Sequence, residues 1–355
     1  MDKLSLKPFL IGGHPTVKAF SQKGESGITL SDNWLSETLF ELLLLAFTLA
    51  FLLSLLQPAW LILPTTMTGG DTGSHFFTAR YLVEHLLPRG RMSGWCMGNY
   101  AGFPMLEYYF PGPFVLMAAI APLFGLQVAF KLVFAMSALL VPMAAWAFFR
   151  FLGRPFPVAV AAAALATCFL VNEGQTMWGG NLASDLAGEF AYGWGFALAV
   201  AWLGLVHRAM ETGRHTVLSA AGLALVGFFH AYALLFAGFS TMYFLLVPGR
   251  FRQNAARLLK IHGLAFLFLC FWLLPLLAHL PNTTRFNIQW IFHDRAQVFR
   301  EVFPVVLWPG MAMFLAAVAW SLVARIRGRE SSLSALAYQP VEKLGIYSLF
   351  KNDEM

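Results

Sequence analysis

The sequence predicts an all-α integral membrane protein, and three observations lead to this fold class. Of its 355 residues, 58% are hydrophobic and only 12% are charged, whereas a soluble domain carries roughly 25% charged residues. The mean hydropathy is +0.65. The apolar residues also gather in runs that are long enough to cross a bilayer. Together these features exclude a soluble globular protein.

About eight membrane-spanning helices are predicted within a polytopic domain at residues 39–325. Some of the runs are short, which leaves room for tilted or broken helices. The run 114–126 is apolar but too short for an ordinary span, and it is bracketed by Pro111, Pro113 and Gly125, so we predict a juxtamembrane helix there. The predicted spans are 39–63, 128–149, 157–171, 190–206, 217–229, 232–247, 261–280 and 305–324.

The positions of the basic residues predict which loops are cytoplasmic, because Lys and Arg prefer that side of a membrane. If 114–126 lies at the membrane surface, most basic residues share the side of the N-terminal segment 1–38 and the tail 326–355. If 114–126 crosses the membrane instead, most basic residues lie on the outer side. The first arrangement is favoured, and it places loops 64–127, 172–189 and 281–304 on the outer face.

Several function classes are disfavoured by composition. The net charge is +6, but the basic residues lie in short loops between apolar runs, so nucleic acid is not an expected partner. The three cysteines, Cys96, Cys168 and Cys270, have no spacing that suits a disulfide framework or a zinc site. The sequence has no glycine-rich phosphate loop, so nucleotide-driven work is not supported.

The first external loop begins with a glycine-rich segment that contains Asp71 and His75. Ser74 can cap a following helix at 76–87, whose apolar face suits the membrane surface. Asp71 would then lie at the boundary between lipid and water, where an acid is costly and usually has a task. The alternative, equally weighted, is that Asp71 only caps this helix or ends the first span.

Further along this loop, Asn99 and Glu107 are polar exceptions in a segment rich in aromatic residues and prolines. Flat apolar faces combined with amide and carboxylate acceptors suit a saccharide ring, although they also suit lipid headgroups. For any single ring, an interfacial aromatic belt without a ligand is the simpler interpretation.

The second external loop contributes Asp185 and Glu189, which share one face if the next helix begins near residue 184. For Asp185 a favourable position at a helix N-terminus is the simpler explanation. We expect Glu189 to sit deeper and to be the second functional acid. His230, beside Tyr232, falls where two predicted spans meet on the outer side, and is either a structural group or a ligand for phosphate or acceptor.

These segments resemble the GT-C superfamily of integral membrane glycosyltransferases, which have an aspartate just after the first span, surface helices and many spans. More closely, they resemble bacterial membrane proteins labelled 6-pyruvoyl-tetrahydropterin synthase-related, over about residues 39–325. The segments that carry the resemblance are Gly70-Asp71-Thr72-Gly73-Ser74-His75, Gly94-Trp95, Tyr100-Ala101-Gly102-Phe103-Pro104, Tyr109-Phe110-Pro111 and Ala187-Gly188-Glu189-Phe190.

The resemblance implies a transferase in the bacterial cytoplasmic (inner) membrane. It would move a sugar from a polyprenyl-phosphate donor to a hydroxyl of a glycan, lipid or protein acceptor on the outer face. Asp71 matches the position of the superfamily's catalytic aspartate, a general base or an acid that helps bind a divalent metal. In some members a second acid directly follows the catalytic aspartate, whereas here Thr72 follows Asp71.

The third external loop offers cations for the phosphate of such a donor. Arginine pairs well with phosphate oxygens, and Arg285 and Arg295 are the candidates that we single out. Solvation, or pairing with lipid headgroups, is the simpler explanation for most arginines of this loop.

Two other classes of protein remain open. In a transporter or lipid-handling protein, Asp71, Glu189 and His230 would line a translocation path. Transporters usually place ionisable groups near the bilayer midplane, often in two repeated halves, whereas these acids fall at the outer boundary and no halves repeat. A structural membrane subunit is the third class.

Overall fold

The computed structural model describes residues 30–98, 101–154, 156–172, 179–247, 249–283 and 294–302, and isolated residues up to 323. The chain divides into two compact units, with the boundary between Pro281 and Asn282. The first unit contains nearly all of the described elements. In the second unit, α12 (Arg295–Val302) begins after Asp294, whose Oδ1 accepts a hydrogen bond of 2.6 Å from the Gln297 amide.

The described part is mainly helical. Its long helices are separated by short helical turns and by one small hairpin, which lies between residues 89 and 112. The α-helices are α1 (Leu30–Leu55), α2 (Pro58–Leu61), α3 (Thr72–Tyr81), α4 (Gly112–Phe124), α5 (Leu126–Phe151), α6 (Val158–Leu170), α7 (Leu182–Ser184), α8 (Phe190–Thr212), α9 (Thr216–Phe229), α10 (Ala231–Ser240) and α11 (Phe251–His279). The other elements are the π-helical turns η1 (Leu82–Leu86) and η3 (Asp185–Glu189), the 3₁₀ turns η2 (Leu87–Arg89), η4 (Thr241–Leu246) and η5 (Leu280–Asn282), and strands β1 (Gly94–Cys96) and β2 (Phe103–Met105).

Four helical segments of the described chain are long and apolar enough to cross a membrane: Glu37–Leu55, Leu126–Phe151, Leu182–Thr212 and Phe251–Asn282. They correspond to predicted spans 39–63, 128–149, 190–206 and 261–280. Predicted spans 157–171, 217–229 and 232–247 appear as the shorter apolar helices α6, α9 and α10 with η4. Most of 305–324 lies outside the described residues, so the count of eight spans stays a prediction.

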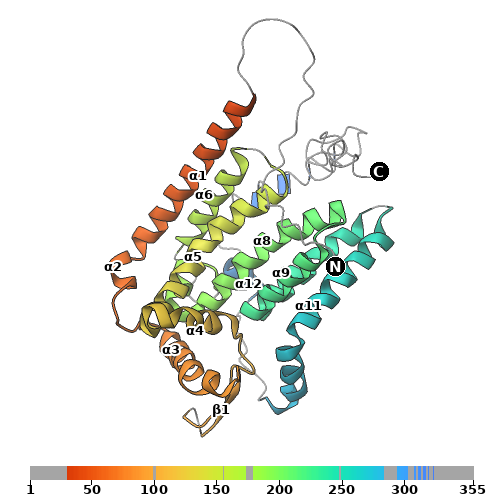
Figure 1. The fold of residues 1–355 in the computed structure, drawn as a ribbon. Coiled ribbons are helices and arrows are strands. Elements are labelled where there is room, and N and C mark those ends of the chain that lie inside the picture. Colours follow the sequence, from red (N-terminus) through yellow and green to blue (C-terminus); the bar gives the residue numbers. More distant parts are fainter. Residues whose placement is uncertain are drawn as a thin grey trace, which may run out of the picture. The chain divides into compact units, whose positions relative to one another are not determined.

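Helices α5 and α8 form the centre of the first unit. They pack along each other, with α6 and α4 against α5, α9 and α10 against α8, and α11 against α9 (Figure 1). Two indole N–H groups of α8 join these helices. Trp194 donates to the Val133 carbonyl on α5 at 2.7 Å, and Trp202 donates to the Ser219 carbonyl on α9 at 2.6 Å. Both bonds satisfy polar groups within an apolar core.

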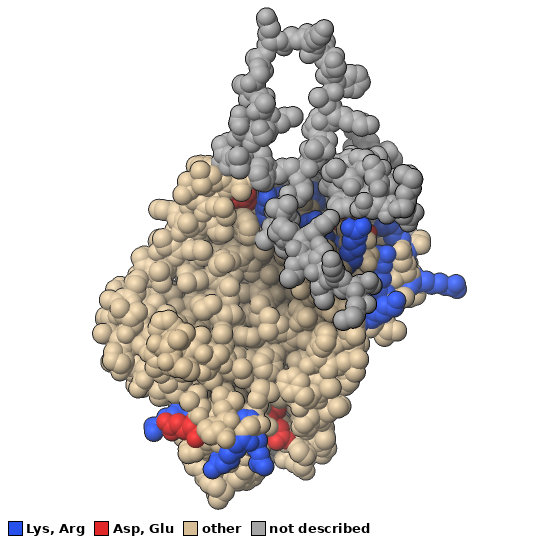
Figure 2. All heavy atoms as spheres, viewed as in Figure 1, with Lys and Arg blue, Asp and Glu red and all other residues tan. Residues whose placement is uncertain are grey.

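The surface of this unit is that of a protein surrounded by lipid. On the face in Figure 2, charged side chains lie at two opposite ends, and a broad band between them has none. Large apolar side chains are exposed on its helices: Phe47 on α1 is 74% exposed, and Leu165 on α6 is 70% exposed. Apolar surface on this scale needs a hydrocarbon solvent or a partner. The fold is therefore that of a membrane protein.

Two buried charges tie α1 and α2 to α5. Glu41, which is 3% exposed, accepts a hydrogen bond of 2.8 Å from the Trp146 indole and lies 3.5 Å from the Arg150 guanidinium. Lys131, which is 4% exposed, donates to the Trp60 carbonyl at 2.6 Å and to the Leu63 carbonyl at 2.5 Å. Glu41 is compensated by side chains of α5, and Lys131 by carbonyl groups of α2 and of the segment that follows it, as burial requires.

We expect Glu41→Ala to lower the stability of the protein by about 3 kcal/mol, because Arg150 would remain buried without its carboxylate. Thermal unfolding in detergent micelles measures the change. Glu84→Ala is the matched control: its partner Arg80 lies at 2.9 Å, but the pair is well exposed, so the loss should be less than about 1 kcal/mol. Equal losses for the two variants would contradict the structural role of Glu41.

The segment between α2 and α5 folds into a layer at one end of the first unit (Figure 1). The predicted helix 76–87 begins four residues earlier, at Thr72, so Ser74 lies inside it instead of capping it. The predicted juxtamembrane helix 114–126 is α4, and Gly125 ends it with a φ of 78°. Between them, β1 and β2 pair antiparallel, with Trp95 opposite Pro104.

Candidate functional site

Two glycine-containing segments, far apart in the sequence, meet around Asp71. The Asp71 amide donates a hydrogen bond of 2.8 Å to the Ala187 carbonyl. Gly70 has a φ of 45°, and a Cβ there would lie 1.9 Å from the same carbonyl oxygen. Gly188 has a φ of 118°, and its Cβ would lie 2.9 Å from that of Asp71. Only glycine allows two backbones to approach this closely, so the two segments hold Asp71 in one place.

We expect Gly70→Ala to destabilise the protein by more than about 2 kcal/mol, because the new methyl group would overlap the Ala187 carbonyl. Gly73→Ala is the control. Gly73 lies in α3, and a Cβ added there would meet no neighbouring group within 4 Å, so the stability of this variant should stay within about 0.5 kcal/mol of the wild type. Thermal unfolding of the two variants tests the difference, and a harmless Gly70→Ala would contradict the close approach.

Asp71 occupies the N-cap position of α3, but its side chain makes no capping hydrogen bond. Its backbone carbonyl accepts from the His75 amide at 3.0 Å and from the Ser74 hydroxyl at 2.8 Å. The residue is exposed. Of the two interpretations from sequence, helix capping by the carboxylate is therefore not seen, and the carboxylate is available for another purpose.

His75 and Tyr109 lie beside this carboxylate among aromatic rings. The His75 Nε2 is 3.5 Å from the Tyr109 hydroxyl, and the ring of His75 lies 5.4 Å from that of Phe190 and 5.9 Å from that of Phe114. Burial lowers the pKa of His75, and the charge of Asp71 opposes this in part. Burial, followed by the charges of Glu189 and Asp71, raises the pKa of Tyr109. At neutral pH the site therefore presents a neutral imidazole and a protonated phenol.

The lowered pKa of His75 predicts a pH dependence of stability. Below the ordinary histidine pKa of 6.5, the unfolded chain binds a proton that the folded site resists, so stability falls as the pH falls. We expect His75→Gln to remove part of this loss. Unfolding temperatures of both proteins between neutral and mildly acidic pH measure it, and parallel curves would contradict the prediction. Other histidines contribute equally to both curves.

Asp185 and Glu189 are the first and last residues of η3. Their depths are the reverse of those predicted. Asp185 is 1% exposed, whereas Glu189 is only partly buried. The Asp185 Oδ2 lies 2.7 Å from the Ser137 hydroxyl on α5. Between the two acids, Gly188 departs from helical geometry with a φ of 118°. Asp185 thus lies near the N-terminus of the helical segment Leu182–Thr212, as expected, but it is buried there.

Glu189 belongs to the same site as Asp71. The charges of Asp71 and Glu189 both act on Tyr109, and that of Asp71 also acts on Glu189. Glu189 in turn acts on Asp185. We call Asp71, Asp185 and Glu189 the acid cluster. Its members come from the start of α3 and from η3, and the contact between Asp71 and Ala187 brings these two elements together.

His230 lies at the predicted junction of two apolar helices, between α9 and α10. It is 5% exposed, and its Nδ1 has no hydrogen-bond partner. Its ring lies 4.1 Å from that of Phe110 and 5.1 Å from that of Tyr192. Because Phe110 follows Tyr109, His230 is connected to the acid cluster through two adjacent aromatic residues.

Glu107 joins the segment between β2 and α4 to α11. Its Oε1 pairs with the His279 Nδ1, and the hydroxyl of Tyr108 donates to the His279 carbonyl at 2.8 Å. The Trp272 indole also donates to the Leu106 carbonyl at 3.2 Å. These contacts give Glu107 a positioning role for the segment that carries Tyr109.

The remaining predicted residues are only partly covered by the structure. Asn99 and Arg285 lie outside the described residues. Arg295 is the exposed first residue of α12 in the second unit. Within the described part of the chain, no group of three His, Cys, Asp or Glu residues is placed to hold a metal ion. The described residues therefore do not form a metal site around Asp71.

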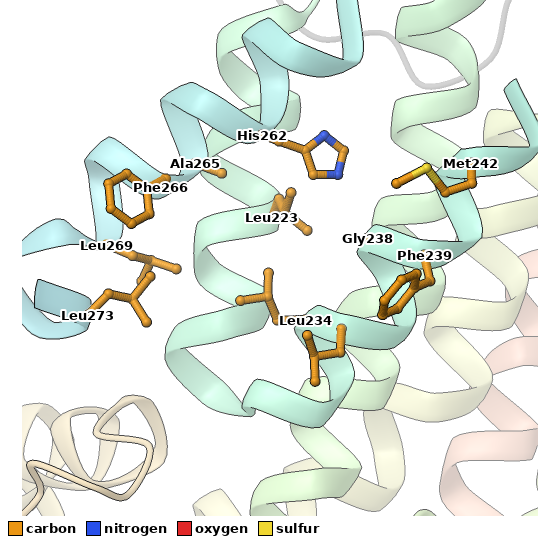
Figure 3. Close-up of a pocket in the computed structure, with 11 residues that line it drawn as sticks. Leu223, Leu234, Gly238, Phe239, Met242, His262, Ala265, Phe266, Leu269 and Leu273 are labelled. Carbon is orange, nitrogen blue, oxygen red and sulfur yellow. The ribbon is translucent and has the colours of Figure 1, made fainter. Parts of the chain in front are cut away.

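An apolar cavity of about 300 Å³ lies among α9, α10, η4 and α11, and side chains from these elements point into it (Figure 3). His262 is its polar exception. Its Nδ1 lies 2.8 Å from the Leu258 carbonyl and therefore donates to it, which leaves Nε2 as an acceptor. Leu234 also lines the cavity, and its amide donates to the His230 carbonyl at 3.1 Å. The cavity thus begins within one helical turn of His230.

Sequence reasoning missed Ser137, Lys131 and His262 as partners, because each is a single polar residue inside an apolar run. Tyr109 belongs to the motif Tyr109-Phe110-Pro111, but the sequence alone gives it no separate role. A polar residue within a predicted span was the available signal, since such groups are rare and are usually paired.

The fold and the acid cluster define a helical membrane protein with several apolar helices and with ionisable side chains gathered at one end of its central bundle. Residues 106–331 match the family described as 6-pyruvoyl-tetrahydropterin synthase related domain, membrane protein. This match covers more than half of the chain, which therefore belongs to that family. It includes Tyr109, Asp185, Glu189 and His230, whereas Asp71 and His75 precede it.

No curated protein matches the chain. No solved structure matches it either.

Proposed function

We propose that this protein is a glycosyltransferase that moves a sugar from a polyprenyl-phosphate donor to an acceptor hydroxyl at the outer face of the bacterial cytoplasmic membrane. The observation that carries the proposal is the carboxylate of Asp71. It is exposed and makes no capping bond, yet its backbone is fixed by Ala187 and Gly188. An acid with a fixed position and a free carboxylate suits a general base.

In the proposed reaction, Asp71 accepts the proton of the acceptor hydroxyl as its oxygen bonds to the anomeric carbon. The bond between that carbon and the donor phosphate breaks at the same centre, and the phosphate leaves with the electron pair. Tyr109, whose phenol stays protonated, and the neutral imidazole of His75 can donate or accept hydrogen bonds to the sugar. The rings of Phe114 and Phe190 keep water away from this side of the site.

The apolar cavity supports a lipid-linked donor. Its lining is almost entirely hydrocarbon, and its volume of about 300 Å³ accepts part of a long chain. Contacts run from Asp71 through His75, Tyr109, Phe110 and His230 to Leu234 at the cavity wall. A donor with its chain in the cavity would thus have its phosphate near His230 and its sugar near Asp71.

The proposed orientation places the acid cluster outside the cell. Each of α5, α8 and α11 has one end far from the acid cluster. In the described part of the chain, more basic residues lie at these ends than on α3 and η2. Under the preference of Lys and Arg for the cytoplasm, this supports a cytoplasmic location for that end. The basic residues concerned are Arg150, Arg154, Arg208, Arg214, Arg250, Arg252, Arg257 and Lys260.

A multi-span transporter or lipid-handling protein is the second candidate, and the buried Asp185 favours it. An acid that is 1% exposed, next to a break in a long apolar helix, is a common feature of ion-coupled transport. In such a protein, Asp71, Glu189 and His230 would line the path. Substitution of Asp71 would then alter transport without any transfer of sugar.

We expect Asp71→Asn to reduce sugar transfer by at least about a hundredfold, because an amide cannot accept the proton. The assay follows labelled sugar from a set of polyprenyl-phosphate sugars to acceptors, with purified protein in lipid. Glu84→Gln, at the same end of the unit and paired with Arg80, is the control and should retain full transfer. Unchanged transfer by Asp71→Asn would overturn the role of Asp71, and binding or movement of lipid without turnover would favour the second candidate.

A further inference from the structure

Asp185 is the most deeply buried acid of the described chain, and the proposed sugar transfer does not use it directly. Its carboxyl group lies between α5 and α8, where a Cβ on Gly193 would be 2.9 Å from Oδ1. In the described residues no basic side chain pairs with it, and Oδ1 has no hydrogen-bond partner. An ionised carboxylate in this position would be strongly unfavourable.

The number of hydrogen atoms available for hydrogen bonds around Ser137 bears on whether Asp185 is protonated. The Ser137 Oγ lies 2.6 Å from the Phe134 carbonyl oxygen and 2.7 Å from the Asp185 Oδ2. Both are hydrogen-bond distances, but a hydroxyl carries one hydrogen and a carbonyl carries none. The Ser137 hydroxyl can donate to Asp185 or to Phe134, and when it donates to Phe134, the contact with Oδ2 needs a hydrogen from Asp185. The burial of Asp185 without a described basic partner favours this second arrangement, in which Oδ2 carries a proton.

We infer that Asp185 and Ser137 form a proton-binding site, in which Asp185 is a neutral carboxylic acid that donates to Ser137. The site takes a proton as its ligand. A small cation such as Na⁺ is the other ligand that a carboxylate and a hydroxyl could bind, and the salt dependence of unfolding distinguishes it from a proton.

The bound proton sets the charge of the acid cluster. Glu189 is the titratable group whose charge acts on Asp185, and it lies on the same π-helical turn. The elements packed against this carboxyl group contribute Ser137 from α5 and Gly193 from α8. With Asp185 neutral, Asp71 and Glu189 can both be ionised. Loss of the proton would add a third negative charge to the acid cluster, in the same turn as Ala187 and Gly188, which hold Asp71.

Infrared difference spectroscopy of the full chain in lipid tests this inference. At neutral pH the wild type should show a carbonyl band of a protonated carboxylic acid that shifts in D₂O and disappears in Asp185→Asn. Absence of that band would overturn the inference. If Asp185→Asn does not fold, Ser137→Ala provides the same test: the band should move to higher frequency, because the acid loses its acceptor, and an unchanged spectrum would count against the site.

A second measurement compares stability across pH. Above about pH 4, where an ordinary aspartate ionises, the unfolded chain releases a proton that the folded chain retains. The unfolding temperature of the wild type should therefore fall, relative to that of Asp185→Asn, as the pH rises toward neutral. A constant difference between the two proteins would overturn the inference. So would a wild-type unfolding temperature that rises with NaCl but not with KCl, because this outcome would identify a sodium site. Glycosyl transfer is not measured in either experiment, so their outcome is independent of the proposed function.

Discussion

The hydrogen bond from the Asp71 amide to the Ala187 carbonyl is the contact on which the site depends. It joins the start of α3 to η3, two elements that lie far apart in the sequence. Gly70 and Gly188 leave no room for a side chain on either side of it. Backbone contact at this distance is far less adjustable than contact between side chains, because neither partner has a rotamer to change. The position of the Asp71 carboxylate is therefore fixed by the main chain.

Around this contact, the protein concentrates acids without placing a described basic side chain among them. Asp71 is exposed to solvent and Glu189 is partly exposed, so water can moderate both charges. Asp185, which has almost no exposure, is moderated by the proton that it shares with Ser137. Such an arrangement keeps the outer part of the site available for a cationic or hydroxylated ligand, since no internal cation of the described chain competes for the carboxylates.

The sequence was sufficient for the fold class and for the segments that form the site, because both rest on local patterns. Runs of apolar residues predicted the helices, and glycine-rich motifs marked the segments around Asp71 and Gly188. The sequence could not predict that these segments touch, because a backbone contact between distant residues leaves no local pattern. It also could not predict the depth of Asp185. The two acids lie in a π-helical turn with a positive φ at Gly188, which the sequence pattern did not indicate. The sequence also could not predict the role of Ser137, because a single polar residue within an apolar run does not indicate its partner.

Lys131 has a consequence for the way the chain assembles during synthesis. Its ammonium group can leave water only when the carbonyl groups of Trp60 and Leu63 are in place, and these precede it in the chain. Helices α1 and α5 can thus pair as soon as α5 has emerged, before Ala187 has been synthesised. The intervening segment, with Asp71 at its start, is then already closed at both ends as a loop. In that order of events, η3 would meet a loop whose two ends already lie together, and the arrival of Ala187 and Gly188 would complete the site.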